Sequence, residues 1–216
     1  MRLFKRWVSI KQGCDILNSN LLEVMKKRRS IYALDKNVDI SKEELASYIK
    51  EIAHYTPSSY NGQSQRLVLL FGEDHDYLWG KIVMETLRKK VGDEEKFKKT
   101  EKKINGFKDA FASILIFEDG KVNENLKEKF PNYAENVDPW SDVNSGLITM
   151  ALWLGLRDIG LGANLQHYNP IIDDETKEKF GIDKDWILKA QMVFGNIIEV
   201  PKEKKKMDID EKVIVK

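Results

Sequence analysis

The chain has 216 residues, of which 42% are hydrophobic and 33% are charged, and its formal net charge at pH 7 is +1. This composition is typical of a folded globular protein and excludes a wholly disordered one. A net charge so close to zero produces no overall positive potential that would attract nucleic acid. The single cysteine, Cys14, excludes an intramolecular disulfide framework and fits a reducing cytoplasm. We expect a cytoplasmic protein of one large domain or two small ones.

The first eighteen residues differ from the rest of the chain. They show no helical period, and they lack the apolar core and the cleavage site of a signal peptide. We expect residues 1–18 to be a poorly ordered extension and residues 19–216 to form the folded domain. The longest apolar run, residues 147–156, is about half the length that a bilayer requires, so we expect no membrane association.

Helix signals begin close to the start of the domain. Ser19 or Asn20 can cap a first helix that runs to about Arg29. Ser41 and Glu44 have the spacing of a capping box and predict the start of a second helix. Periodicity predicts further helices over residues 75–90, 142–159 and 173–180, a charged stretch that is helical or mobile over residues 91–108, and an irregular amphipathic stretch over residues 122–138.

Strand signals are intermixed with these helices. Continuous apolar runs predict buried strands over residues 66–71 and 112–117 and a third long strand over residues 187–198. Residues 163–166 read as a short strand, and residues 212–215 as a candidate fourth long one. Because helices and strands do not alternate strictly, we predict an α+β fold.

The segment over residues 160–170 is the most informative in the chain. It follows the helix over residues 147–156, which is apolar on every side, and glycines at 155, 160 and 162 let the backbone turn tightly and approach something closely. A strand end of this kind suits the face of a planar cofactor. A buried helix followed by a β-turn is the alternative interpretation.

Three further segments carry groups that bind phosphate or polar ring edges. Arg28, Arg29 and Ser30 close the first helix, and guanidinium groups offer forked donors to phosphate, although a solvated basic helix end has the same composition. Residues 57–65 form a polar loop whose amides and hydroxyls can reach a ribityl chain or a heterocycle. The lysines at 204–206 offer charge for a phosphate or form a solvated tail.

Several chemistries are missing from the sequence. The three histidines lie far apart, and no zinc-protease, Cys-x-x-Cys, P-loop, dinucleotide-binding or Gly-x-Ser-x-Gly motif is present. We therefore expect no metal site, and His167 is by default a packed or solvated histidine.

Taken together, four segments resemble the nitroreductase family of FMN-dependent oxidoreductases, particularly the subgroup of fatty-acid-repression-type proteins and short bacterial nitroreductases. The sequence Arg-Arg-Ser-Ile-Tyr-Ala-Leu at 28–34 looks like that subgroup's opening motif. Residues 57–64 resemble the family's Pro-Ser-Ser-x-Asn-x-Gln loop, and residues 160–170 resemble the subgroup's flavin-facing strand. Lys204 and Lys206 resemble, more loosely, the family's C-terminal phosphate contacts.

The resemblance implies a mixed, mostly antiparallel sheet flanked by helices and a domain-swapped homodimer with two FMN sites at the interface. A helix that is apolar all round also needs cover, which a second copy can supply. The implied cofactor contacts are Arg28, Arg29 and Ser30 with phosphate and the pyrimidine edge, Pro57, Ser58, Ser59, Asn61 and Gln63 from the other subunit, Leu165, Gln166 and His167 near flavin N5, and Lys204 and Lys206 with phosphate.

The implied activity uses the cofactor's chemistry. NADH or NADPH would give hydride to flavin N5 and leave, and a nitroaromatic, quinone or similar acceptor would then take its place. No side chain need act as acid or base; Arg28 or Arg29 is the candidate to stabilise the reduced, anionic flavin. Two alternatives remain: a regulatory FMN-binding protein with little turnover, and an α+β binding module without flavin.

Overall fold

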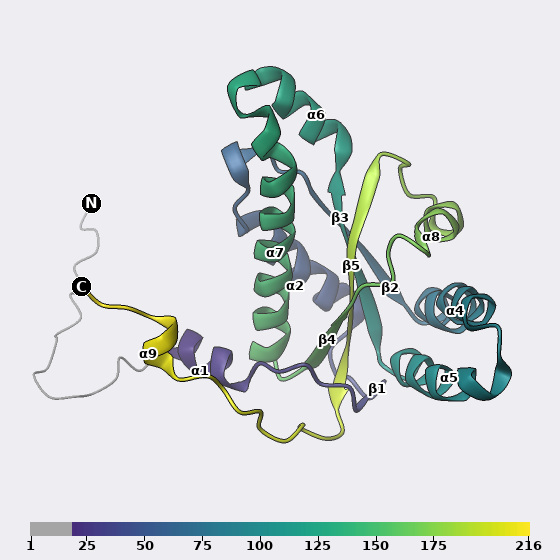
Figure 1. Cartoon of the computed structure of the whole chain (residues 1–216). Coiled ribbons are helices and arrows are strands. Elements are labelled where there is room, and N and C mark those ends of the chain that lie inside the picture. The colour runs from purple at the N-terminus through teal and green to yellow at the C-terminus, as the bar shows by residue number, and fades with distance from the viewer. Residues whose placement is uncertain (1–18) are drawn as a thin grey trace, which may run out of the picture.

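The computed structural model describes residues 19–216, and Figure 1 shows a central sheet with helices on both faces. The prediction for residues 1–18 lies outside the described residues. Within residues 19–216, no helix is long and apolar enough to cross a membrane. The helices are α1 Asn20–Lys27, α2 Lys42–Tyr55, α3 Glu73–Tyr77, α4 Met84–Val91, α5 Glu94–Lys108, α6 Gly120–Lys129, α7 Ala134–Asp158, α8 Asp173–Phe180 and α9 Ile209–Lys212, with the π-helical turn η2 Leu78–Val83 and the 3₁₀ turns η1 Ser59–Asn61 and η3 Pro131–Tyr133.

The sheet has the order β1-β5-β3-β2, and β4 pairs with β5 beside β1. All pairs between these strands are antiparallel, while an isolated parallel bridge joins Ser30 to Ala163. The predicted α+β fold with a mixed, mostly antiparallel sheet is therefore confirmed. The strands are β1 Leu34–Asp35, β2 Gln65–Phe71, β3 Ala112–Asp119, β4 Gly162–Gln166 and β5 Trp186–Ile197.

Two hydrophobic cores lie on opposite faces of the sheet. Successive side chains of a strand point to opposite faces, so the fully buried strand β3 supplies both cores. On one face, α2 and α7 cover residues such as Ile114 and Met192. On the other, α4, α5 and η2 cover residues such as Leu115 and Val193. The helix predicted from the capping box begins as expected, because Ser41 and Glu44 make both reciprocal bonds.

Helix α7 is longer than the sequence predicted. It starts at Ala134 rather than near residue 142 and contains Pro139, so the stretch expected to be irregular holds α6, η3 and the first turns of α7. Its buried positions 137, 141, 144, 145 and 148 have helical spacing, but three of them carry Ser or Asn. Because these buried residues are polar, they hid the periodicity that hydrophobic patterning detects.

Two strand predictions need correction, and one strand was missed. Residues 212–215 form no strand; the short helix α9 ends at Lys212, and Val213–Val215 is exposed. Strand β2 is an edge strand that is mostly half-buried, whereas its apolar run predicted full burial. The two-residue strand β1 was not predicted, because it is too short to show a period. The charged residues 94–108 form α5, which buries Phe97, Ile104 and Phe107.

The glycine-rich segment makes its predicted close approach to other segments of the same chain. A Cβ atom on Gly162 would lie 2.8 Å from side-chain atoms of Leu34 and Ile197. Gly160, with φ of 89°, provides the left-handed turn between α7 and β4. The glycines therefore fit β4 tightly against β1 and β5, which fixes where the strand end lies.

Candidate functional site

The arginine motif and the strand-end motif lie side by side. The Ile31 N–H donates to the Ala163 carbonyl at 2.9 Å, and the buried side-chain amide of Asn164 donates to the Ile31 carbonyl at 2.9 Å. Residues 28–32 thus run parallel to β4 after α1 ends at Lys27. Two segments that are far apart in the sequence, with Ile31 and Asn164 separated by 133 positions, form one edge of a candidate site.

Both guanidinium groups in this motif are available to an anion. Arg28 lies over the ring of Trp153, 4.6 Å from its centroid, and Arg29 Nη2 donates to the Lys202 carbonyl at 3.0 Å. Within residues 19–216, the arginines that form ion pairs are Arg66 and Arg88, so Arg28 and Arg29 form none there. The Lys202 contact brings the start of the C-terminal tail next to Arg29. Lys204 and Lys206 are exposed a few residues farther along this tail.

The residues predicted at the end of β4 do not share one face. Leu165 pairs with Met192 and packs in the core beneath α7, whereas Gln166 pairs with Gln191 on the opposite face. His167 is exposed and lines a cavity of about 260 Å³ with Leu165 and α7. A single ring therefore cannot lie against all three side chains, and only the backbone of the strand is common to both faces.

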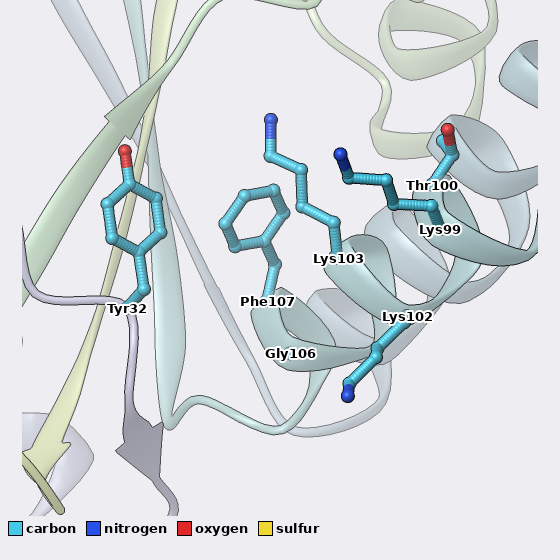
Figure 2. A pocket seen from close by; sticks show the side chains of 7 residues that line it. All are labelled: Tyr32, Lys99, Thr100, Lys102, Lys103, Gly106 and Phe107. Carbon is cyan, nitrogen blue, oxygen red and sulfur yellow. The ribbon is translucent and has the colours of Figure 1, made fainter.

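A larger pocket, missed by the sequence reasoning, adjoins this edge. It holds about 520 Å³ between Tyr32 and α5. Figure 2 shows Phe107 and the Lys103 side chain on the side of α5 that looks toward Tyr32. The Lys103 ammonium lies 5.4 Å from the Phe107 ring centroid and 5.6 Å from that of Tyr168, two residues after Gln166. The lining residues are Tyr32, Lys99, Thr100, Lys102, Lys103, Gly106 and Phe107.

The pocket is cationic as well as aromatic. The α5 lysines that form ion pairs are Lys96 and Lys98, so Lys99, Lys102 and Lys103 pair with no carboxylate within residues 19–216. Among the residues that the structure describes, no acidic side chain lines the pocket. The helical spacing of Phe97, Ile104 and Phe107 in the sequence indicates that one face of this helix is buried against the sheet. The many charged residues of the stretch obscured that spacing.

A buried histidine fixes the end of α5 that forms the pocket wall. His75 Nε2 lies 3.1 Å from the Phe107 carbonyl, which can only accept, so Nε2 carries the proton. Nδ1 then accepts from the Ser113 hydroxyl at 3.0 Å, and Ser113 accepts from Trp79 Nε1 at 2.8 Å. Burial is the main reason that the pKa of His75 falls to about 4. The histidine is neutral at pH 7 and serves the structure of the wall.

The loop over residues 57–65 lies elsewhere in the same chain. Both the N–H and the hydroxyl of Ser59 donate to Asn144 Oδ1, at 2.9 and 3.1 Å. Asn144 precedes the Trp153 that Arg28 covers by nine residues, or about 14 Å along the α7 axis. Within a single chain, this loop therefore does not lie next to the arginine motif. Asn61 and Gln63 instead line a second pocket, of about 380 Å³, between α2 and β2.

The tip of the loop has an unusual conformation. Tyr60, Asn61 and Gln63 all have φ near +50°, a region that side chains other than glycine adopt at some cost. The Tyr60 ring contacts Phe130, Trp140 and Tyr133, with centroid distances of 4.5, 5.2 and 6.2 Å. This packing holds the tip in place, yet 51% of Tyr60 stays exposed.

Comparison with known proteins identifies the family. The profile of the nitroreductase family matches residues 25–196. The chain belongs to the nitroreductase family. HBN1 of Saccharomyces cerevisiae is 33% identical over 185 residues, which cover 85% of this chain and 91% of HBN1. The structure of the nitroreductase CinD from Lactococcus lactis in complex with nicotinic acid is 39% identical, with a TM-score of 0.84, and the match covers 90% of this chain and 98% of CinD.

A nitroreductase-type oxidoreductase is therefore the class of this enzyme. CinD has also been solved in complex with chloramphenicol and with 4-nitrophenol, each with a TM-score of 0.83 to this chain. A protein from Exiguobacterium sibiricum solved in complex with FMN is 22% identical, with a TM-score of 0.66 over 92% of this chain and 98% of its own, and it shares the fold. Residues 19–216 contain no cluster of side chains that could hold a metal ion.

Proposed function

We propose that this nitroreductase is an FMN-dependent enzyme that oxidises NADH or NADPH and reduces nitroaromatics, quinones or similar small acceptors. The observation that carries the proposal is the meeting of three features at one edge of the sheet. These are the arginine motif without ion pairs, the end of β4, and the cationic aromatic pocket beside Tyr32. They come from distant parts of the sequence, and together they suit a flat, anionic, phosphate-bearing cofactor.

The donor set fits FMN. A pocket of about 520 Å³ is within the usual range for small-molecule sites, roughly 300–1,000 Å³. Its aromatic walls suit a flat ring, and its lysines suit the charge that the ring gains on reduction. When bound, FMN supplies the redox chemistry, which is the transfer of two electrons and a proton through N5 of its ring, from the nicotinamide to the acceptor in a ping-pong sequence.

The protein's own residues bind, orient and stabilise charge. Arg28, Arg29 and Ser30, with Lys204 and Lys206 on the tail that Arg29 contacts, would hold the phosphate and the pyrimidine edge. The Lys103 ammonium, placed between two aromatic rings, is a further candidate to stabilise negative charge on the reduced ring. Leu165 and His167 on one face of β4, and Gln166 on the other, would flank the ring rather than cover it together.

A homodimer would complete the site. The loop residues Pro57, Ser58, Ser59, Asn61 and Gln63 would then serve the flavin of the partner subunit, since they cannot reach the arginine motif of their own chain. Helix α7 supports this arrangement because Leu147 is 41% exposed on the side away from the sheet. The exposed apolar residues Ile209, Val213, Ile214 and Val215 make the C-terminal tail a candidate for exchange between subunits.

The experiment is an absorbance spectrum of the purified protein followed by steady-state oxidation of NADH and NADPH with 4-nitrophenol or a quinone. We expect a flavin spectrum, released as FMN on denaturation, and turnover that depends on the acceptor. A colourless protein that does not take up added FMN would refute the proposal. Bound FMN with negligible turnover on every acceptor would instead favour the regulatory flavoprotein.

A further inference from the structure

Glu118 is a buried acid that the proposed reaction does not use. It lies near the end of β3 with 0% exposure, and burial raises the pKa of its carboxyl group above the ordinary value. Its partners are hydroxyl groups, Ser64 Oγ at 2.5 Å and Ser145 Oγ at 3.2 Å. No cation forms an ion pair with it within residues 19–216; the nearby Lys189 pairs with Asp142 on the surface. Burying a carboxylate without a paired cation costs free energy that hydrogen bonds from neutral hydroxyl groups offset only in part.

The hydrogen bonds of Glu118 lead directly to the candidate flavin loop. A carboxylate only accepts, so Ser64 donates to Glu118, and the Ser64 oxygen accepts from Asn144 Nδ2 at 3.3 Å. With its nitrogen turned toward Ser64, Asn144 presents Oδ1 to the N–H and hydroxyl of Ser59. The acceptor character of Glu118 therefore favours the same orientation of the Asn144 amide that the Ser59 N–H requires, and the bonds from Glu118 to Ser59 form one consistent chain.

Ser59 is the last residue before the strained part of the loop. Tyr60, Asn61 and Gln63 with their positive φ angles follow at once, so the backbone there keeps its conformation only if its ends are fixed. Ser64, on the other side of the strained part, is fixed as well, since its carbonyl accepts from the Asp119 N–H at 2.8 Å. The hydrogen bonds of Glu118 and of the neighbouring Asp119 N–H thus reach Ser59 and Ser64, which lie at the two ends of the loop tip.

We propose that Glu118 is a positioning residue for cofactor binding, which acts through Ser64 and Asn144 to hold Ser59 and the loop tip in the conformation that contacts the flavin of the partner subunit. This inference rests on the proposed function, because it needs FMN at that site. Glu118 touches no reacting atom, and its effect is on the geometry of the loop.

The test compares Glu118→Gln and Ser64→Ala with a control on the same strand and face, Ile116→Ala. For each apoprotein, the FMN dissociation constant, the exchange rate of the Ser59 amide hydrogen and the thermal midpoint are measured. Gln has the shape of Glu, but it can accept from only one of the two serines and it carries no charge, so the bond from Ser64 is weakened or reversed while the packing stays. We expect Glu118→Gln to weaken FMN binding about three- to tenfold and to speed Ser59 exchange, with little change in midpoint.

The remaining variants separate positioning from general stability. Ile116→Ala should lower the thermal midpoint more and leave FMN affinity within about twofold. Because Ser64 and Glu118 act in one chain of bonds, the double variant should be no worse than the weaker-binding single one. Unchanged FMN affinity and unchanged Ser59 exchange in both variants, or strictly additive losses, would overturn the role of Glu118. A wild-type apoprotein that binds no FMN would refute the proposed function itself.

Discussion

Lowering the pH from 7 to 4.5 adds a proton to His75 in almost every unfolded chain but in a minority of folded ones. The folded pKa is about 4 because the ring is buried and its two nitrogens are bonded as a neutral tautomer. Among nearby charges, Asp76 raises this pKa and Lys36 lowers it, and both effects are smaller than that of burial. The unfolded value is about 6.5.

The sign and the size of the effect follow from this depression. Stability from a neutral His75 is fully present above pH 6.5 and is lost as the pH falls through about 4, because the unfolded state binds more protons in that window. The whole difference corresponds to about 3 kcal/mol, and about 2 kcal/mol of it is lost between pH 7 and pH 4.5. The side chain is fully buried, so solvent does not screen the effect.

The assay is urea unfolding followed by circular dichroism at pH 7 and pH 4.5, on the wild type and on His75→Gln. The glutamine keeps a donor for the Phe107 carbonyl and does not titrate. The raised pKa of Glu118 acts in the opposite sense, since protonation at low pH favours the folded state, but it is common to both proteins and cancels in the comparison. The wild type should lose about 2 kcal/mol more than the variant. A pH dependence equal within about 0.5 kcal/mol in both proteins would refute the reasoning.

Three further predictions concern the site. Arg28→Ala should weaken FMN binding about tenfold to a hundredfold in a fluorescence titration of the apoprotein, as expected for the loss of a hydrogen bond to a charged group. Lys204→Ala should weaken binding less because Lys204 lies in an exposed tail, and wild-type affinity in both variants would contradict the phosphate assignment. Leu147→Lys should give a monomer by light scattering that has lost FMN, because the exposed face of α7 would carry a charge into the interface; a yellow monomer would argue against a shared site. The half-exposed Tyr60 ring at the loop tip could stack on an aromatic acceptor. Tyr60→Leu should then weaken binding of 4-nitrophenol to the oxidised holoenzyme about two- to tenfold, whereas Tyr60→Phe, which keeps the ring, should match the wild type. Equal affinities in all three proteins would exclude this stacking role.

Local signals in the sequence determined most of the elements. The capping box at Ser41 and Glu44 needs only residues three positions apart, and it forms as expected. The apolar runs of β3 and β5 predicted the two long central strands, because a strand buried on both faces is mostly apolar. Arg28 and Ser30 could be named as candidates from the sequence because an arginine carries its charge and its forked donors in any fold, and their role in binding stays a prediction.

Tertiary structure decided everything that depends on partners distant in the sequence. The start of α7 was missed because Ser141, Asn144 and Ser145 are buried polar residues, and only their partners on β3 and in the loop make that burial tolerable. The split of β4 into two faces follows from its register with β5, and the pocket beside Tyr32 follows from the packing of α5 on the sheet. Hydrophobic periodicity records which side of an element is buried, whereas a site is formed by the surfaces that meet there, and those are set only when the chain has folded.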